Sequence, residues 1–256
     1  MWDLWPALML ILAGAAAGCI NALVGSGTLI TFPTLLALGV PPVSANMTSS
    51  LGIFAGNITS LAGYSSAVAA CRPLLRWLAP AALIGGLSGS VLLLWLPSRV
   101  FGAVVPWLIG LALVLVAIGP WLTKTFVKDP GNRPVFVPLP VLAVLVGLAG
   151  VYGGYFGAAQ GVLLMGILGV LSSESLQTLN GLKITLVTLV NLMSLAVFLG
   201  IAWDRIDWAG VLWVAIGSAI GGWLGGRYGS QLPPWALRIV ILVVGTTALI
   251  VMILRG

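Results

Sequence analysis

The 256-residue chain is too apolar to be a soluble protein: hydrophobic residues make up 60% of it and charged residues 6%, against about 25% charged in soluble domains. It has no His and only five Asp and Glu, so few groups are available for metal binding or acid–base catalysis. The pI of 9.9 comes from Lys and Arg in short loops, which is typical of a membrane protein and does not indicate a nucleic-acid partner.

The first half of the chain is expected to form five apolar helices, and one of them is short. A helix of about 20 apolar residues crosses a bilayer. The second segment has Pro33 within it, so it either crosses tilted or re-enters on one side. A loop is expected over residues 71–76, and a glycine-rich break over residues 25–27. The five segments cover residues 5–24, 28–40, 44–70, 78–96 and 100–122.

The second half repeats this order, which predicts an internal duplication. We expect a first repeat over residues 1–123, a polar linker over 124–137 and a second repeat over 138–256. Closely spaced glycines recur in matching segments, where small residues let helices approach each other in lipid: Gly85, Gly86 and Gly89, then Gly221, Gly222 and Gly225. The second-half segments cover residues 138–157, 162–171, 176–201, 208–226 and 235–254.

The relative orientation of the repeats depends on the two short segments. If both cross the membrane, the all-α chain has ten spans and inverted repeats; if both re-enter, it has eight spans and parallel repeats. The Lys and Arg distribution fits both arrangements equally well. We favour inverted repeats, because a midplane site shared by two inverted repeats is a common transporter arrangement.

Each repeat contains one polar stripe. At about 100° per residue, the four residues of each stripe fall on one helical face, and the face opposite the second stripe is Leu, Ile and Val. Two polar stripes in an apolar chain suggest one shared binding site. The stripes are Asn46, Ser49, Asn57 and Ser60 in the first repeat, and Asn180, Lys183, Asn191 and Ser194 in the second.

Lys183 is the only ionisable residue deep in an apolar segment. A charge at the bilayer centre costs about 2.5 to 3.5 kcal/mol on insertion scales, so it needs water, a partner or a path to the interface. No apolar segment holds a carboxylate that would neutralise it, whereas a bound small anion would. The alternative is that the flexible side chain snorkels to the headgroups. Its place among the stripe residues favours anion binding.

The uncharged candidates have structural alternatives too. Asn57 and Asn191 lie in mid-helix, where an amide often only joins neighbouring helices. Asn46 and Asn180 lie near helix starts, where they are expected to cap free amides and direct the positive dipole end at an anion. Further donors are expected from the break, at Gly25 and Gly27, and from Gln160. Tyr152 and Tyr155 are either donors or interface anchors.

The chain resembles the TauE/SafE family of sulfite exporters and sulfonate permeases over about residues 13–252. The resemblance rests on Ala45-Asn-Met-Thr-Ser49 after the first break, and on Gly150-Val-Tyr-Gly-Gly-Tyr-Phe-Gly157 followed by Asn180-Gly-Leu-Lys183. In the first half, the family's usual run of glycines is reduced to residues 25–27. The resemblance implies transport of sulfite, sulfoacetate or a related sulfonate across the bacterial inner membrane, without a cofactor.

The sequence therefore predicts a secondary transporter that exports a small anion by alternating access. Its expected partners are the anionic substrate, membrane lipid and a second copy of the chain in a homodimer. A passive anion channel is the alternative. The lack of a nucleophile–base pair argues against an enzyme, and the lack of sizeable soluble domains against a docking subunit. The expected substrate-binding residues are Lys183, Asn180, Asn46, Ser49, Thr48, Gln160, Gly25, Gly27, Asn57 and Asn191.

Overall fold

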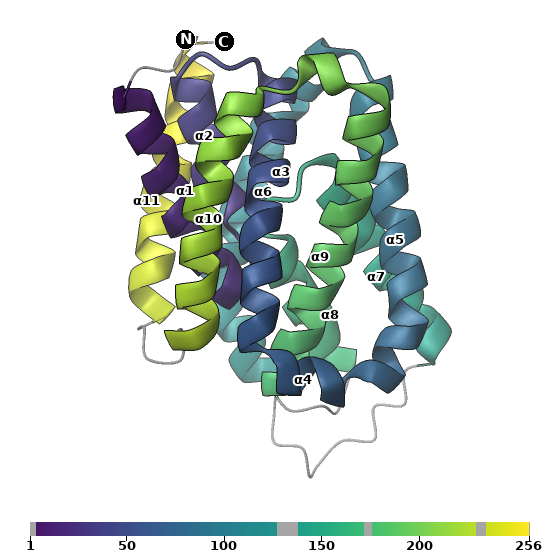
Figure 1. Ribbon diagram of the computed structural model, residues 1–256. Helices are drawn as coiled ribbons and strands as arrows, with labels where there is room; N and C mark the ends of the chain where they lie inside the picture. Colours follow the sequence, from purple (N-terminus) through teal and green to yellow (C-terminus); the bar gives the residue numbers. More distant parts are fainter. Residues whose placement is uncertain (1–3, 127–137, 172–175, 229–233, 256) are drawn as a thin grey trace.

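The computed structural model describes residues 4–126, 138–171, 176–228 and 234–255, and within these ranges it contains helices and no strand (Figure 1). The first half forms α1 (Leu4–Leu23), α2 (Thr28–Ala37), α3 (Pro42–Gly63), α4 (Ser65–Ala70), α5 (Arg72–Trp95) and α6 (Ser98–Phe126). The second half forms α7 (Leu139–Tyr155), α8 (Gln160–Leu171), α9 (Leu176–Ile201), α10 (Trp208–Tyr228) and α11 (Pro234–Arg255), with a short 3-10 turn at Trp203–Arg205.

The outer surface is that of a membrane protein. Within the described ranges, five helices are long and apolar enough to cross a bilayer, namely α1, α5, α6, α9 and α10. Large apolar side chains such as Trp95 and Trp107 are more than three-quarters exposed, which is unfavourable in water and favourable in lipid. The expected all-α class is confirmed. Figure 1 shows α1 beginning and α11 ending at the same end of the molecule.

Glycines join the long helices closely, as the sequence predicted. A Cβ on Gly85 or Gly89 of α5 would overlap backbone atoms of α7, and a Cβ on Gly221 of α10 would overlap the Ala15 carbonyl of α1. Helices in lipid gain little from the hydrophobic effect, so such close backbone approach supplies much of their attraction. Three tightly packed pairs result: α1 with α10, α3 with α10, and α5 with α7.

Three expected boundaries need correction. The segment over residues 44–70 is two helices, because the chain turns at Tyr64 between α3 and α4. The loop expected over residues 71–76 is instead the start of α5, since Pro73 lies in the first turn, where a proline costs no hydrogen bond. Residues 124–126 end α6, and the rest of the predicted linker lies outside the described residues.

The two short helices follow two breaks that meet in the interior. Gly25 and Gly157 have φ values of +80° and +77°, a conformation that suits glycine, and each ends the helix before it. The Gly161 amide donates a hydrogen bond of 3.0 Å to the Gly25 carbonyl. A Cβ on either residue would overlap the other's Cα. The starts of α2 and α8 are therefore held together.

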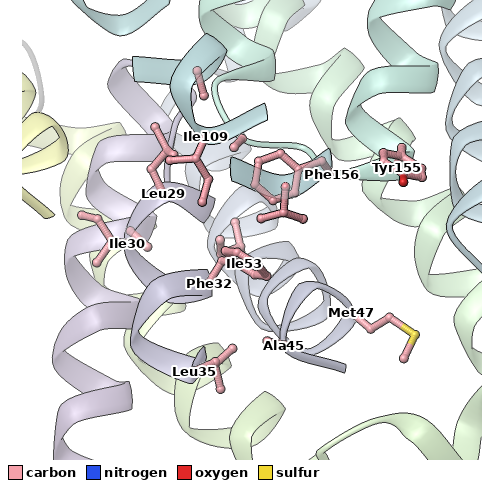
Figure 2. Packing of buried hydrophobic residues seen from close by; sticks show 14 of the residues in the cluster. Leu29, Ile30, Phe32, Leu35, Ala45, Met47, Ile53, Ile109, Tyr155 and Phe156 are labelled. Atoms are coloured by element: carbon pink, nitrogen blue, oxygen red, sulfur yellow. The ribbon is translucent and has the colours of Figure 1, made fainter. Parts of the chain in front are cut away.

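Aromatic rings fill the space around this crossing. Phe32 of α2 packs edge-on against Phe156, with ring centroids 5.4 Å apart, and Phe101 of α6 packs against Phe156 and Tyr155. Figure 2 shows Phe156 close to Phe32 and Leu29, within the main cluster of buried apolar residues. The second break is thus packed against the first short helix.

Candidate functional site

Lys183 lies against the end of α1. Its side chain is 0% exposed, and Nζ donates to the carbonyls of Leu23 at 3.0 Å and Ala22 at 3.4 Å and to Asn180 Oδ1 at 3.2 Å. The last carbonyls of a helix have no partner within it and carry the negative end of its dipole. An ammonium with three protons suits this place. The contacts are internal, which argues against snorkelling.

All three hydrogen-bond partners of Lys183 are neutral. The acids Asp204 and Asp207 follow the far end of α9, and the 18 residues from Lys183 to Ile201 correspond to about 27 Å of helix. Dipoles and carbonyls lower the cost of burying the ammonium but do not cancel its charge. Within the described part of the chain, the positive charge of Lys183 next to the breaks is therefore not neutralised by a carboxylate.

Asn46 caps the end of α7, as Lys183 caps the end of α1. Asn46 Nδ2 donates to the Tyr155 carbonyl at 3.0 Å, and its Oδ1 is buried with no partner in the described part of the chain. Asn46 and Asn180 were expected to cap amides at the starts of their own helices. That expectation was wrong for Asn46, which caps a carbonyl of another helix. Asn180 accepts from Lys183, and the residues just before its helix lie outside the described chain.

Asn57 joins a network that the sequence did not reveal. The Gly27 amide donates to Asn21 Oδ1 at 3.3 Å, and Asn21 Nδ2 donates to Asn57 Oδ1 at 2.5 Å. Asn21 is the only amide side chain in α1, so no stripe pointed to it. The available signal was its place four residues before Gly25. Asn57 is 3% exposed, and its Nδ2 has no partner among the described residues.

Ser26 and Gln160 flank the contact between the breaks. Ser26 precedes Gly27, the residue that caps α2, and Gln160 is the first residue of α8. Their exposures are 1% and 2%, and Ser26 Oγ and Gln160 Nε2 are without partners in the described chain. Both polar groups thus lie at helix N-termini, where the dipole favours an anion.

The other stripe residues mostly hold helices together. Ser49 bonds Thr31 of α2 at 2.5 Å, and Thr48 accepts from the Asp207 amide at 3.3 Å. Ser60 donates to the Gly222 carbonyl of α10, and Ser194 accepts from Ser90 of α5. Asn191 is half-buried on α9. The structure therefore brings only part of each stripe to the breaks.

The Tyr152 hydroxyl also has its partner inside the protein. Its hydroxyl donates to the Ala158 carbonyl at 2.5 Å, which ties the end of α7 to the second break. Ala159 in the same break has a φ of +58°, which is uncommon for a residue with a Cβ. The hydrogen bond helps to hold this backbone conformation.

The comparisons agree with a transport site. A sequence model of the sulfite exporter TauE/SafE family matches residues 10–252, nearly the whole chain. No curated protein and no solved structure matches. Because the match covers far more than half of the chain, the protein belongs to the TauE/SafE family of sulfite exporters, which is a family of membrane transporters and not of enzymes.

Proposed function

We propose that the protein is a secondary transporter that exports a small sulfur-containing anion, such as sulfite, sulfoacetate or another organosulfonate, across the bacterial inner membrane. The observation that carries the proposal is Lys183: a fully buried ammonium with only neutral partners, at the point where two broken helices meet. A buried charge of this kind favours an anion of opposite sign nearby. That the anion contains sulfur is inferred from the family.

We further propose that residues 1–123 and 138–256 are two inverted repeats, joined at 124–137, with the substrate between them near the midplane. The packing supports this arrangement, because the pair α1 and α10 corresponds to the pair α7 and α5. Both breaks carry a glycine of almost the same φ, and a helix of the opposite half caps the helix end before each break. Inverted repeats with discontinuous helices commonly work by alternating access.

Lys183 attracts the anion mainly through its charge. Its three protons already have acceptors, so an anion that touched Nζ would replace one of them. At an effective dielectric constant of about 20, a unit charge roughly 6 Å away is worth about 2.8 kcal/mol. That is about a hundredfold in affinity, so direct contact is not required.

The test is uptake and binding in two steps. Calorimetry on purified protein with sulfite, sulfoacetate, sulfate and acetate should show saturable binding of a sulfur anion. Proteoliposomes loaded with the bound anion should then show saturable counterflow. A passive channel, the alternative, predicts flux that rises linearly with concentration and no counterflow. If no sulfur anion in the panel binds, the proposal is wrong.

A further inference from the structure

Three donors next to the breaks are buried without partners in the described chain: Ser26 Oγ, Asn57 Nδ2 and Gln160 Nε2. Their side chains are at most 3% exposed. We infer that these three groups bind the oxygens of the substrate's sulfur oxyanion directly, and that Lys183 attracts the anion through its charge without contacting it. The inference rests on the proposed function and names its ligand groups.

The backbone brings the residues that carry two of the donors, Ser26 and Gln160, close to one contact. Gly25 and Gly161 are in direct contact through the hydrogen bond from the Gly161 amide to the Gly25 carbonyl. Ser26 and Gln160 are each one residue from this contact. Each also stands at the start of a short helix, so the positive dipole ends of α2 and α8 lie beside them.

The third donor is fixed by a chain of hydrogen bonds. A backbone amide can only donate, so the bond from Gly27 identifies the Asn21 atom that receives it as the oxygen. Asn21 must then donate through Nδ2 to the oxygen of Asn57. The unpaired atom of Asn57 is therefore its NH2 group, and Asn21 orients it next to the first break.

The donor set fits a particular substrate chemistry. A buried donor without a partner is unfavourable, and an ordered water or a ligand usually satisfies it. Three donors match the three oxygens of a sulfite or sulfonate group, whereas a carboxylate offers two. Donors at two helix N-termini also suit an anion better than a neutral ligand. This arrangement thus selects the –SO3 group over a carboxylate.

The test compares sulfoacetate with malonate, which has a carboxylate in place of the sulfonate. Ser26→Ala removes one donor with the smallest change in shape, and Gln160→Glu replaces an NH2 by an oxygen. Each should weaken sulfoacetate binding at least about tenfold in calorimetry, the loss typical of one hydrogen bond to a charged group. The affinity for malonate should change less. The matched control is Ser88→Ala, because Ser88 is an exposed serine that donates to the Ile84 carbonyl of its own helix.

Two results would overturn the inference. If both variants stay folded by thermal unfolding and size-exclusion chromatography yet bind sulfoacetate as the parent does, the unpaired donors are hydration sites. If the variants lose affinity for sulfoacetate and malonate equally, the donors do not distinguish the –SO3 group from a carboxylate. In both cases binding by the parent survives, so the proposed transport function stands. Absence of sulfur-anion binding by the parent would instead reject both proposals.

Discussion

The two breaks have nearly the same backbone shape and different chemistry. Each has a glycine at positive φ, and each follows a helix whose end is capped by a helix of the other half. The first helix end receives a charged ammonium from Lys183, and the second receives a neutral amide from Asn46. The same carbonyl groups need a donor in both places, so the fold requires a cap but not a charge. The charge at one end only is best explained by function.

The breaks also differ in how tightly they are packed. Gly25 touches Gly161 across the crossing, whereas the nearest neighbour of a Cβ on Gly157 is the Gly153 carbonyl of its own half. Gly25 therefore tolerates a side chain less well than Gly157, its counterpart of positive φ at the second break. Variants at each break can test both differences.

The largest effect is expected from Gly25→Ala. The new Cβ meets backbone that cannot move aside, and alanine at positive φ is strained by about 1–2 kcal/mol in addition. We expect a loss of about 4 kcal/mol or more in the free energy of unfolding, visible as a collapse in folded yield and thermal stability in detergent. The control is Gly39→Ala, which has a φ of +87° but open space for a Cβ. A similar loss in both variants would show that packing at the crossing is unimportant.

Lys183→Gln separates charge from capping. The glutamine amide still offers two protons to the α1 carbonyls, and burying an ammonium no longer costs free energy, so stability should change little. Affinity for the sulfur anion should fall about a hundredfold, as the Coulomb estimate above indicates. Titration calorimetry measures this. Arg76→Gln, at an exposed position, removes the same charge elsewhere and should bind normally. Normal binding by Lys183→Gln would reduce Lys183 to a helix cap.

Asn46→Leu tests the neutral cap. The Tyr155 carbonyl loses its donor, at a cost of about 1–3 kcal/mol, but the variant also removes the unpaired Asn46 Oδ1. We expect a net loss of about 1–2 kcal/mol, measured as a lower melting temperature in detergent. A far larger loss would mean that the two helix ends depend on their caps to different extents.

The smallest effect is expected from Asn191→Leu. This amide corresponds to Asn57 in the other stripe but is half-buried on α9. We expect stability to change by less than about 0.5 kcal/mol, as is usual for substitutions away from special features. Sulfoacetate affinity should stay within about twofold. A larger drop in affinity would restore Asn191 to the substrate site and favour the whole stripe as its lining.

Much of the fold was predictable from local pattern. Apolar length placed α1, α9 and α10 to within a few residues, and the glycine breaks marked where α2 and α8 begin. The errors concern helix boundaries at Pro and Gly residues. Pro73 lies within the loop expected over residues 71–76, although a proline also fits the first turn of a helix. The turn at Tyr64 follows Gly63, a common helix terminator, within an otherwise continuous apolar run.

The site was predictable only in part, because periodicity gives the face of a helix and not what lies against it. Lys183 stood out by its charge, but two of its three partners are some 160 residues away in α1. Asn21 is alone in its segment and forms no periodic pattern, so only the folded chain shows that it orients Asn57. The roles expected of Ser49 and Thr48 as substrate ligands stay predictions, although both hydroxyls already have protein partners.

The hydrogen bond between Gly161 and Gly25 has a consequence for how tightly the membrane stays sealed. It ties the start of one short helix to the break before the other, so neither can shift far without pulling its counterpart. In the proposed alternating-access cycle, this tie would couple the movements of the two short helices, so that an opening on one side of the membrane accompanies closure on the other. An exporter with such coupling would not leak, because a pathway open to both sides at once would let the substrate flow back.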